Sequence, residues 1–357
     1  MDLFPVLVTR DAGDSTPACD TGNEFDGRLG VRISSIFVIL VGSLFGAVFP
    51  VLARRMGGSG IPPWAFFIAK YFGSGVIIAT AFIHLLAPAE QALNNPCLTG
   101  PITEYSWVEG IVLMTIVVMF FVELMVMRYS RFGMGHGHGD DDEHHHLGAI
   151  GANELKDDGI EEANAHMPGD DHLGHSREHR DAEMAKTGGT SLEDYAAQLT
   201  AVFILEFGII FHSVFIGLTL AVTGSEFTTL YVVLVFHQTF EGLGLGSRLA
   251  TIPWPRSKRW TPYLLGVGYA LSTPIAIAIG LGVRYTYPPN GRTTLLVNGV
   301  FDSISAGILI YTALVELMAH EFMFSTAMRR ASIRTVLAAF GLLCLGAALM
   351  ALLGKWA

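Results

Sequence analysis

The stretch Glu206–Gly246 decides the fold, and it reads EFGIIFHSVFIGLTLAVTGSEFTTLYVVLVFHQTFEGLGLG. Two apolar segments flank a short polar break, and each segment carries a histidine where a hydrocarbon side chain is expected. Polar side chains at membrane depth are costly and usually functional. His237 and Glu241 are four residues apart, so a helix places them on one face, one turn apart. The pair is therefore predicted to supply two ligands of one metal site.

The first of the two segments supplies a third donor, His212. Counting about 1.5 Å per residue from the predicted helix ends puts His212 and His237 at about the same depth, roughly 14 Å below one membrane surface. The sequence therefore predicts that His212, His237 and Glu241 meet inside the bilayer.

The composition indicates a membrane protein, because 51% of the residues are hydrophobic and only 15% are charged. A soluble domain has about 25% charged residues. Runs of about 20 apolar residues, long enough to cross about 30 Å of hydrocarbon as helix, occur eight times. They are residues 31–53, 64–88, 107–127, 197–222, 228–248, 261–285, 293–319 and 332–354. The predicted fold class is an all-α polytopic membrane protein with eight transmembrane helices.

The positions of Lys and Arg predict the orientation of these helices. Basic residues are concentrated in the connections after the first, third, fifth and seventh helices, which are therefore the cytoplasmic ones. The connections after the second and fourth helices contain no Lys or Arg. Both termini are expected on the extracellular side, and the first 30 residues do not resemble a cleaved signal peptide.

A segment of different character separates the third and fourth helices. Residues 131–195 contain 16 acidic residues, five basic residues and nine of the 13 histidines. Such a composition predicts a disordered cytoplasmic loop that binds metal weakly. The predicted organisation is an extracellular tail (1–30), helices one to three (31–130), the His-rich acidic loop (131–195) and helices four to eight (196–357).

Several other residues stand out. His84 in the second helix is interpreted as a ligand along the ion pathway, with a packing role as the alternative. In the seventh helix, Glu316 is interpreted as part of an exit-side metal station, whereas Asp302 falls near the outer surface. Cys19 and Cys97 both fall on the predicted outer side, where a disulfide can form, but the sequence leaves their pairing open.

The donor types indicate which ion the central cluster takes. Imidazole with carboxylate suits Zn²⁺ and also Fe²⁺, Mn²⁺ and Cd²⁺, whereas Ca²⁺ and Mg²⁺ prefer oxygen ligands. A structural zinc site has four protein ligands, and neither helix offers a cysteine. Three strong donors leave positions open, as an ion that must enter and leave requires.

The motifs HSVFIG (212–217), HQTFEG (237–242) and SAGILIYTALVEL (305–317), together with the ending LLGKWA, resemble those of the ZIP (Zrt-, Irt-like protein) metal transporters, and most closely the fungal plasma-membrane zinc uptake proteins. The resemblance implies the ZIP-type helix bundle, inward transport, a transport site at His212, His237 and Glu241, and dimers in many members. Some members have a second metal site, whose matching positions here are Ser213, Gln238 and Thr273. Because Ile216 replaces the fourth-helix glutamate of the two-metal members, one strong site is expected.

The resulting prediction is a zinc uptake transporter of the plasma membrane, with no cofactor. Its expected partners are Zn²⁺ and the lipid bilayer, and neither a nucleic acid nor ATP is expected, since no phosphate-binding G-x-x-x-x-G-K-[ST] loop occurs. Two alternatives remain. An intramembrane zinc hydrolase would activate water on the same three ligands, but H-E-x-x-H is absent. A metal receptor would use the His-rich loop for signalling.

Overall fold

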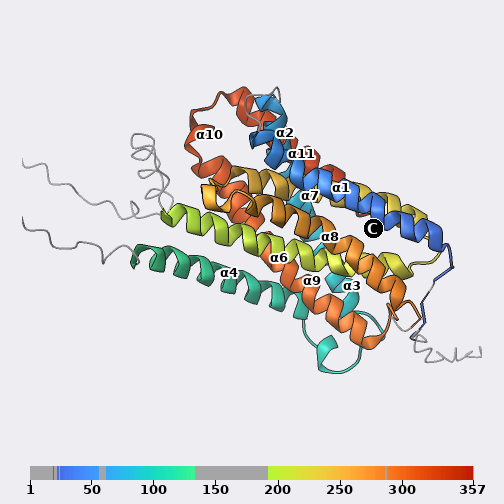
Figure 1. Ribbon diagram of the computed structural model, residues 1–357. Coiled ribbons are helices and arrows are strands. Elements are labelled where there is room, and N and C mark those ends of the chain that lie inside the picture. Colours follow the sequence, from blue (N-terminus) through green and yellow to red (C-terminus); the bar gives the residue numbers. More distant parts are fainter. Residues whose placement is uncertain are drawn as a thin grey trace, which may run out of the picture.

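The computed structural model describes residues 19, 22–23, 25–55, 62–132, 192–285 and 288–356. Within these residues nearly all of the chain is helical and no strand occurs, and the long helices run side by side in one bundle (Figure 1). The predicted all-α fold class is therefore confirmed. Most of the predicted N-terminal tail and nearly all of the His-rich loop lie outside the described residues, so the predictions for them stay predictions.

The helices follow one another with short connections wherever the chain is described. In chain order they are α1 (Leu29–Arg55), α2 (Pro63–Ala79), the π-helix η1 (Thr80–Leu86), α3 (Ala87–Leu93), the 3₁₀ turn η2 (Pro101–Thr103), α4 (Trp107–Phe132), α6 (Leu192–Val222), α7 (Phe227–Thr251), the 3₁₀ turn η3 (Arg256–Lys258), α8 (Thr261–Gly282), α9 (Arg292–Thr312), the π-helix η4 (Ala313–Phe324), α10 (Thr326–Arg330) and α11 (Ile333–Leu353).

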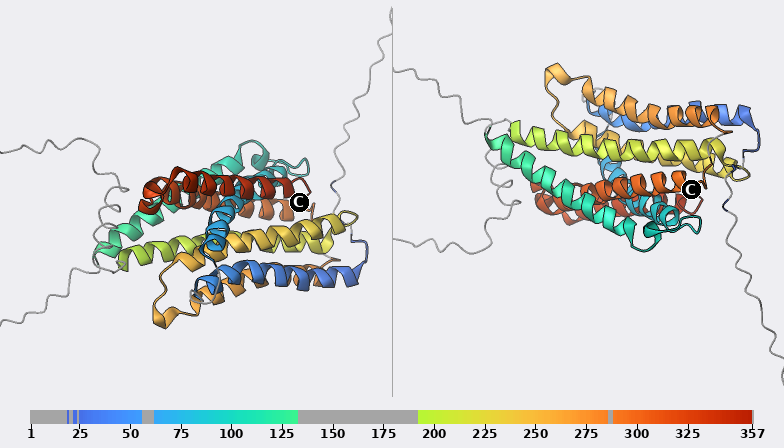
Figure 2. Two further views of the ribbon diagram at one scale, coloured as in Figure 1. Left: turned by 90° about the horizontal axis from the view of Figure 1, so that it is seen from above. Right: turned by 90° about the horizontal axis from the view of Figure 1, so that it is seen from below.

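Seven helical segments in the described chain are both long and apolar enough to cross a membrane. The eighth predicted span corresponds to α7, which has 25 residues and is less apolar because it carries polar side chains such as His237, Gln238 and Glu241. Its length exceeds the roughly 20 residues that a span needs. The outer helices α1 and α4 lie on opposite sides of the bundle (Figure 1 and Figure 2).

The sequence predicted one continuous helix for the second span. The structure differs, because the π-helix η1 separates α2 from α3. Pro88 has no N–H, so the carbonyl of His84, four residues earlier, lacks its ordinary helical partner. A local widening of the helix accommodates this loss, and such π segments are frequent at functional sites. His84 lies within η1 and is buried.

Glycines set the position of α7 against α1. A Cβ atom on Gly46 of α1 would lie 2.3 Å from the carbonyl oxygen of Thr239, and one on Gly246 of α7 would lie 2.3 Å from the carbonyl oxygen of Ala47. Only glycine permits such close approach, which is typical of helix packing in membranes. The contact therefore fixes the helix that carries two of the three predicted metal donors.

The predicted extracellular ends of the helices are tied together by a disulfide and by a buried arginine. Cys19 is bonded to Cys97, with 5.5 Å between their Cα atoms, so the pairing that the sequence left open is formed. The Arg32 side chain is fully buried and donates hydrogen bonds to the carbonyls of Leu220 and Ala221, each at 3.0 Å. A guanidinium at the C-terminal end of α6 satisfies carbonyls that have no partner within the helix.

Candidate metal centre

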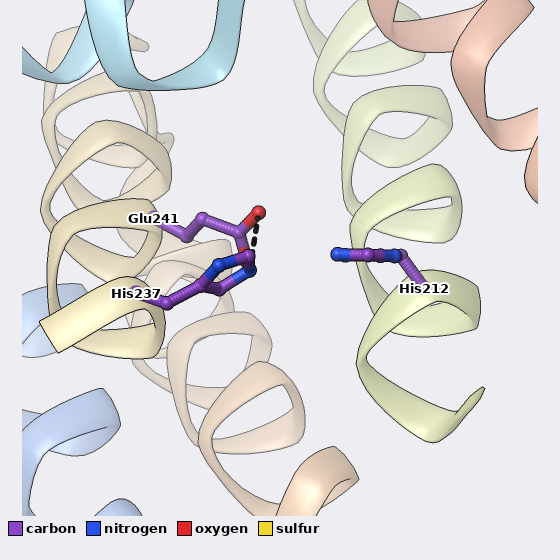
Figure 3. Close-up of side chains that lie close together, drawn as sticks. All are labelled: His212, His237 and Glu241. Carbon is purple, nitrogen blue, oxygen red and sulfur yellow. Dashed lines mark ion pairs between the residues drawn. The ribbon is translucent and has the colours of Figure 1, made fainter. Parts of the chain in front are cut away.

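Three buried side chains from two neighbouring helices converge in the middle of the bundle. His212 projects from α6, and His237 and Glu241 project from α7 toward it (Figure 3). Each side chain offers a donor atom within 4.8 Å of the other two. Nε2 of His237 lies 3.3 Å from Oε1 of Glu241, as expected for residues four apart on one helix face. The structure thus brings together the three donors that the sequence analysis singled out.

The donor atoms of this cluster have no hydrogen-bond partners. Both ring nitrogens of His212 and of His237, and both carboxylate oxygens of Glu241, are buried and make no hydrogen bond. Buried polar atoms are almost always satisfied, because leaving one unpaired costs about 1–3 kcal/mol. Six unsatisfied atoms in one place are therefore the strongest sign of a bound ion in the described chain.

The donor set is suited to a borderline divalent cation. Two imidazoles and one carboxylate are the ligands that Zn²⁺ prefers, and they also accept related transition-metal ions. Three protein ligands leave at least one position for water, unlike a closed structural site. The arrangement can hold an ion that must later leave.

His84 lies beside the cluster without joining its three donors. Its ring is edge-on to that of His237, with 4.5 Å between the ring centroids. Its Nε2 lies 2.9 Å from the carbonyl oxygen of Met350 on α11, a hydrogen bond that occupies this nitrogen. The predicted pathway residue is therefore adjacent to the site, and its orientation is set by α11.

The predicted second-site residues Ser213, Gln238 and Thr273 are also buried, and Ser213 and Gln238 directly follow His212 and His237 in the chain. Nε2 of Gln238 is 3.3 Å from Oγ of Ser213, and both side chains are fully buried. Oε1 of Gln238 and Oγ1 of Thr273 make no hydrogen bond. These neutral oxygens can assist an ion, but they add no charge to balance a second one.

Glu316 does not belong to this cluster. It lies in η4 and, with Glu123 and Tyr311, lines a separate cavity of about 20 Å³ between α4, α6 and the last part of the seventh span. The hydroxyl of Tyr311 donates to the carboxylate of Glu123. The prediction of an exit-side metal station at Glu316 stays a prediction, since the one group of three metal donors found among the described residues is His212, His237 and Glu241.

Asp302 was predicted to lie near the outer surface, and its proximity to His212 was not predicted. Asp302 is buried in α9, and its Oδ1 lies 3.9 Å from Nδ1 of His212. Counted from the first residue of α9, Asp302 is ten residues into the helix, and His212 is ten residues from the last residue of α6. The sequence therefore could have shown that Asp302 and His212 lie at a similar depth. It could not have shown that α9 is rotated so that Asp302 faces α6.

The fold and these buried donors define a polytopic helical membrane protein with a candidate cation site in its interior. The family model described as ZIP Zinc transporter matches residues 29–354. Zinc-regulated transporter 1 of Saccharomyces cerevisiae is 44% identical over 94% of this chain and 90% of the relative. Zinc-regulated transporter 2 of the same yeast is 42% identical over 98% of this chain and 99% of its own length. Zinc-regulated transporter 1 of Schizosaccharomyces pombe is 41% identical over 99% and 92%.

The chain therefore belongs to the ZIP family of zinc transporters, and it is a transporter and not an enzyme. The family stated as a resemblance in the sequence analysis is confirmed, as is the similarity to fungal members. The hydrolase alternative is thereby excluded.

Proposed function

We propose that this protein carries Zn²⁺ across the plasma membrane into the cytoplasm through the site formed by His212, His237 and Glu241. The observation that carries this proposal is the set of six buried, unsatisfied donor atoms on two helices. The yeast relatives bear names that describe zinc-regulated transporters, which supports zinc as the cargo. Fe²⁺, Mn²⁺ and Cd²⁺ are the competing ions that this donor set would also accept.

The membrane potential can drive the proposed direction without ATP. A double positive charge moving inward across about 100 mV gains about 4.6 kcal/mol, equivalent to about three orders of magnitude in concentration. Binding of Zn²⁺ by cytoplasmic ligands, including the His-rich loop, would deepen this gradient. The loop is accordingly proposed to tune transport and not to perform it.

Uptake into sealed vesicles tests the proposal. The full-length protein is reconstituted into proteoliposomes, and zinc entry is followed with a trapped fluorescent indicator, with and without an inside-negative potassium diffusion potential. We expect saturable entry that the potential accelerates. A receptor without transport activity would give no entry above protein-free vesicles.

The site is tested by Glu241→Gln, which removes a charge and leaves the shape of the side chain. Loss of the charge that offsets the ion's desolvation should reduce uptake by at least about 100-fold, corresponding to about 3 kcal/mol. The matched control is Glu226→Gln, the same change at an exposed position before α7. Normal flux in a correctly inserted Glu241→Gln protein would refute the site, whereas zinc flux in the wild type would still support the transport function.

The choice of cargo is tested in the same vesicles by competition. Unlabelled Fe²⁺, Mn²⁺, Cd²⁺ or Ca²⁺ is added outside at equal concentration, and the reduction in zinc entry is measured. Imidazole donors predict that Cd²⁺ competes best and Ca²⁺ not at all. Strong competition by Ca²⁺ would contradict the proposed ligand set.

A further inference from the structure

A large basic cavity lies where α1 and α7 end and α8 begins. Its volume is about 570 Å³, and four arginines line it, namely Arg54, Arg55, Arg256 and Arg259. Two aromatic residues, Trp254 and Tyr263, also line the cavity. No acidic residue belongs to this lining in the part of the chain that the structure describes. The cavity therefore concentrates positive charge on a concave surface.

Three of the four arginines, Arg54, Arg55 and Arg259, have aromatic neighbours. The guanidinium of Arg55 lies 5.6 Å from the ring centre of Tyr263 and 5.8 Å from that of Trp260, and Arg259 lies 5.7 Å from Trp260. Among the described residues, none of the four arginines forms an ion pair with a carboxylate. Arg248, by contrast, is paired with Glu321 at 3.0 Å. The positive charge of the four arginines is therefore not neutralised by a carboxylate of the described residues, and it can bind an anion.

The position of the cavity indicates where that anion comes from. Arg54 and Arg55 end α1, and Arg256 and Arg259 lie between α7 and α8, on the side that the distribution of basic residues predicts to be cytoplasmic. Trp and Tyr side chains are enriched at the level of lipid headgroups. The inner leaflet carries the anionic lipids, and basic pockets between membrane helices on this side bind phosphorylated headgroups.

The chemistry of the lining is suited to an anion that carries several phosphate groups. A guanidinium presents a planar fork of donors that binds two phosphate oxygens at once. Four such groups around one cavity can accept more than one phosphate. The volume also lies in the range of about 300–1,000 Å³ that is usual for small-molecule sites.

We propose that this cavity binds the polyphosphorylated inositol headgroup of an anionic lipid of the inner leaflet. The proposal uses the orientation proposed above but does not depend on the cargo of the metal site. The simpler explanation is that the arginines only fix the orientation of the helices in the membrane and bind no particular lipid. The two explanations differ in whether the effect of an arginine depends on its position in the cavity or only on its charge.

The test is lipid binding to the purified full-length protein in nanodiscs. Displacement of a fluorescent phosphatidylinositol bisphosphate is measured with phosphatidylcholine, phosphatidylserine or unlabelled phosphatidylinositol bisphosphate as the competitor. We expect the bisphosphate lipid to bind at least about tenfold more tightly than phosphatidylserine. Equal displacement by the two anionic lipids would overturn the proposal, because it would show a response to net charge alone.

Variants locate the binding. The double variant Arg256→Gln with Arg259→Gln should bind the bisphosphate lipid about 30-fold more weakly, since each basic residue near an anionic surface contributes about 1 kcal/mol. The charge-matched control is Lys258→Gln with Arg330→Gln, which removes two basic residues outside the lining on the same predicted side. Equal weakening in both double variants would overturn the proposal.

Two further measurements test whether the weaker binding is caused by misfolding and whether the ligand of the cavity is a soluble anion. Arg256→Lys with Arg259→Lys keeps the charge and removes the forked geometry, so partial weakening of about three- to tenfold is expected in a protein that keeps its charge balance. Soluble inositol trisphosphate should compete with the lipid, whereas inorganic phosphate at the same concentration should not. Competition by inorganic phosphate with no preference for the lipid would assign the cavity to a soluble anion and overturn the lipid assignment.

Discussion

The carboxylate of Asp302 on α9 lies 3.9 Å from Nδ1 of His212 on α6. Histidines that bind metal usually direct their second ring nitrogen to a carboxylate or a carbonyl, which fixes the orientation of the ring. Asp302 also adds a second negative charge beside Glu241, so the two carboxylates together match the charge of one dication. We therefore expect Asp302 to orient His212 and to balance part of the charge of a bound ion.

Asp302→Asn should raise the KM for zinc uptake by about 10- to 100-fold, the usual effect of losing such a partner, with a smaller change in kcat. Asp302→Glu, which restores the charge, should recover part of the loss. The measurement is initial uptake in proteoliposomes over a range of zinc concentrations. Glu109→Gln, at an exposed position in the first turn of α4, is the control. An unchanged KM in Asp302→Asn would show that the 3.9 Å contact has no role in binding.

The second-site residues should matter less than the first-site residues. Ser213, Gln238 and Thr273 are fully buried but offer only neutral oxygens as ligands. Two dications about 4 Å apart would repel by about 16 kcal/mol at an effective dielectric constant of 20, and the carboxylates of Glu241 and Asp302 together match the charge of only one of them. Gln238→Ala and Thr273→Ala should therefore retain part of the uptake, unlike Glu241→Gln.

The same reasoning predicts one tightly bound metal per protomer. Because the His-rich loop would bind metal itself, the measurement is elemental analysis of a protein from which residues 136–180 are deleted. Glu241→Gln in that background should remove the metal, and Glu226→Gln should retain it. Two tightly bound metals that are both lost with Glu241→Gln would show a binuclear centre.

The metal donors were predictable from the sequence because their signals are local. The spacing of His237 and Glu241 fixes their common face on one helix, and the rise per residue gives the depth of His212 without knowledge of the packing. The partnership of Asp302 depends on how α9 is rotated against α6, which no local pattern reveals.

Other features depended on contacts that the hydropathy pattern does not report. The π-helix η1 follows from Pro88 within a continuous apolar run, where the composition alone predicts a regular helix. Arg32 lies at the outer end of α1, yet it is fully buried because the carbonyls of α6 and the Phe227 ring, 4.4 Å from the guanidinium, surround it. A count of basic residues per connection cannot show that a particular arginine packs inside the bundle.

Asp26, which lies just before α1, should make the stability of the folded protein depend on pH. Hydrogen bonds from Arg28 and Arg32 lower the pKa of Asp26 from 3.8 to about 2. A carboxyl with a depressed pKa stabilises the folded state above its unfolded pKa, and this contribution is lost as the pH falls through the folded value. Asp26→Asn should therefore flatten the dependence of the melting temperature on pH between about 4 and 2. Glu104→Gln, at an exposed residue, is the control, and identical pH profiles for Asp26→Asn and wild type would contradict this assignment.

Glu321 of η4 joins three helical segments at the predicted cytoplasmic end. Its Oε2 lies 2.5 Å from Nζ of Lys70 on α2, and its Oε1 lies 3.0 Å from Nη1 of Arg248 on α7. The three side chains are only 12–20% exposed, so removal of the carboxylate leaves two poorly solvated cations close together. Removing one member of a fully buried ion pair costs about 3–5 kcal/mol, and partial exposure lowers this to about 1–3 kcal/mol.

Glu321→Gln should therefore lower the free energy of unfolding by more than Lys70→Met does, because Lys70→Met leaves Glu321 paired with Arg248. Lys70→Met combined with Glu321→Gln should recover part of the loss, since only one cation then lacks its partner. The measurement is thermal unfolding of each protein in the same detergent, completed as a double-mutant cycle. Strict additivity of the two single effects would show that Lys70 and Glu321 do not stabilise the bundle through each other, despite the 2.5 Å between them.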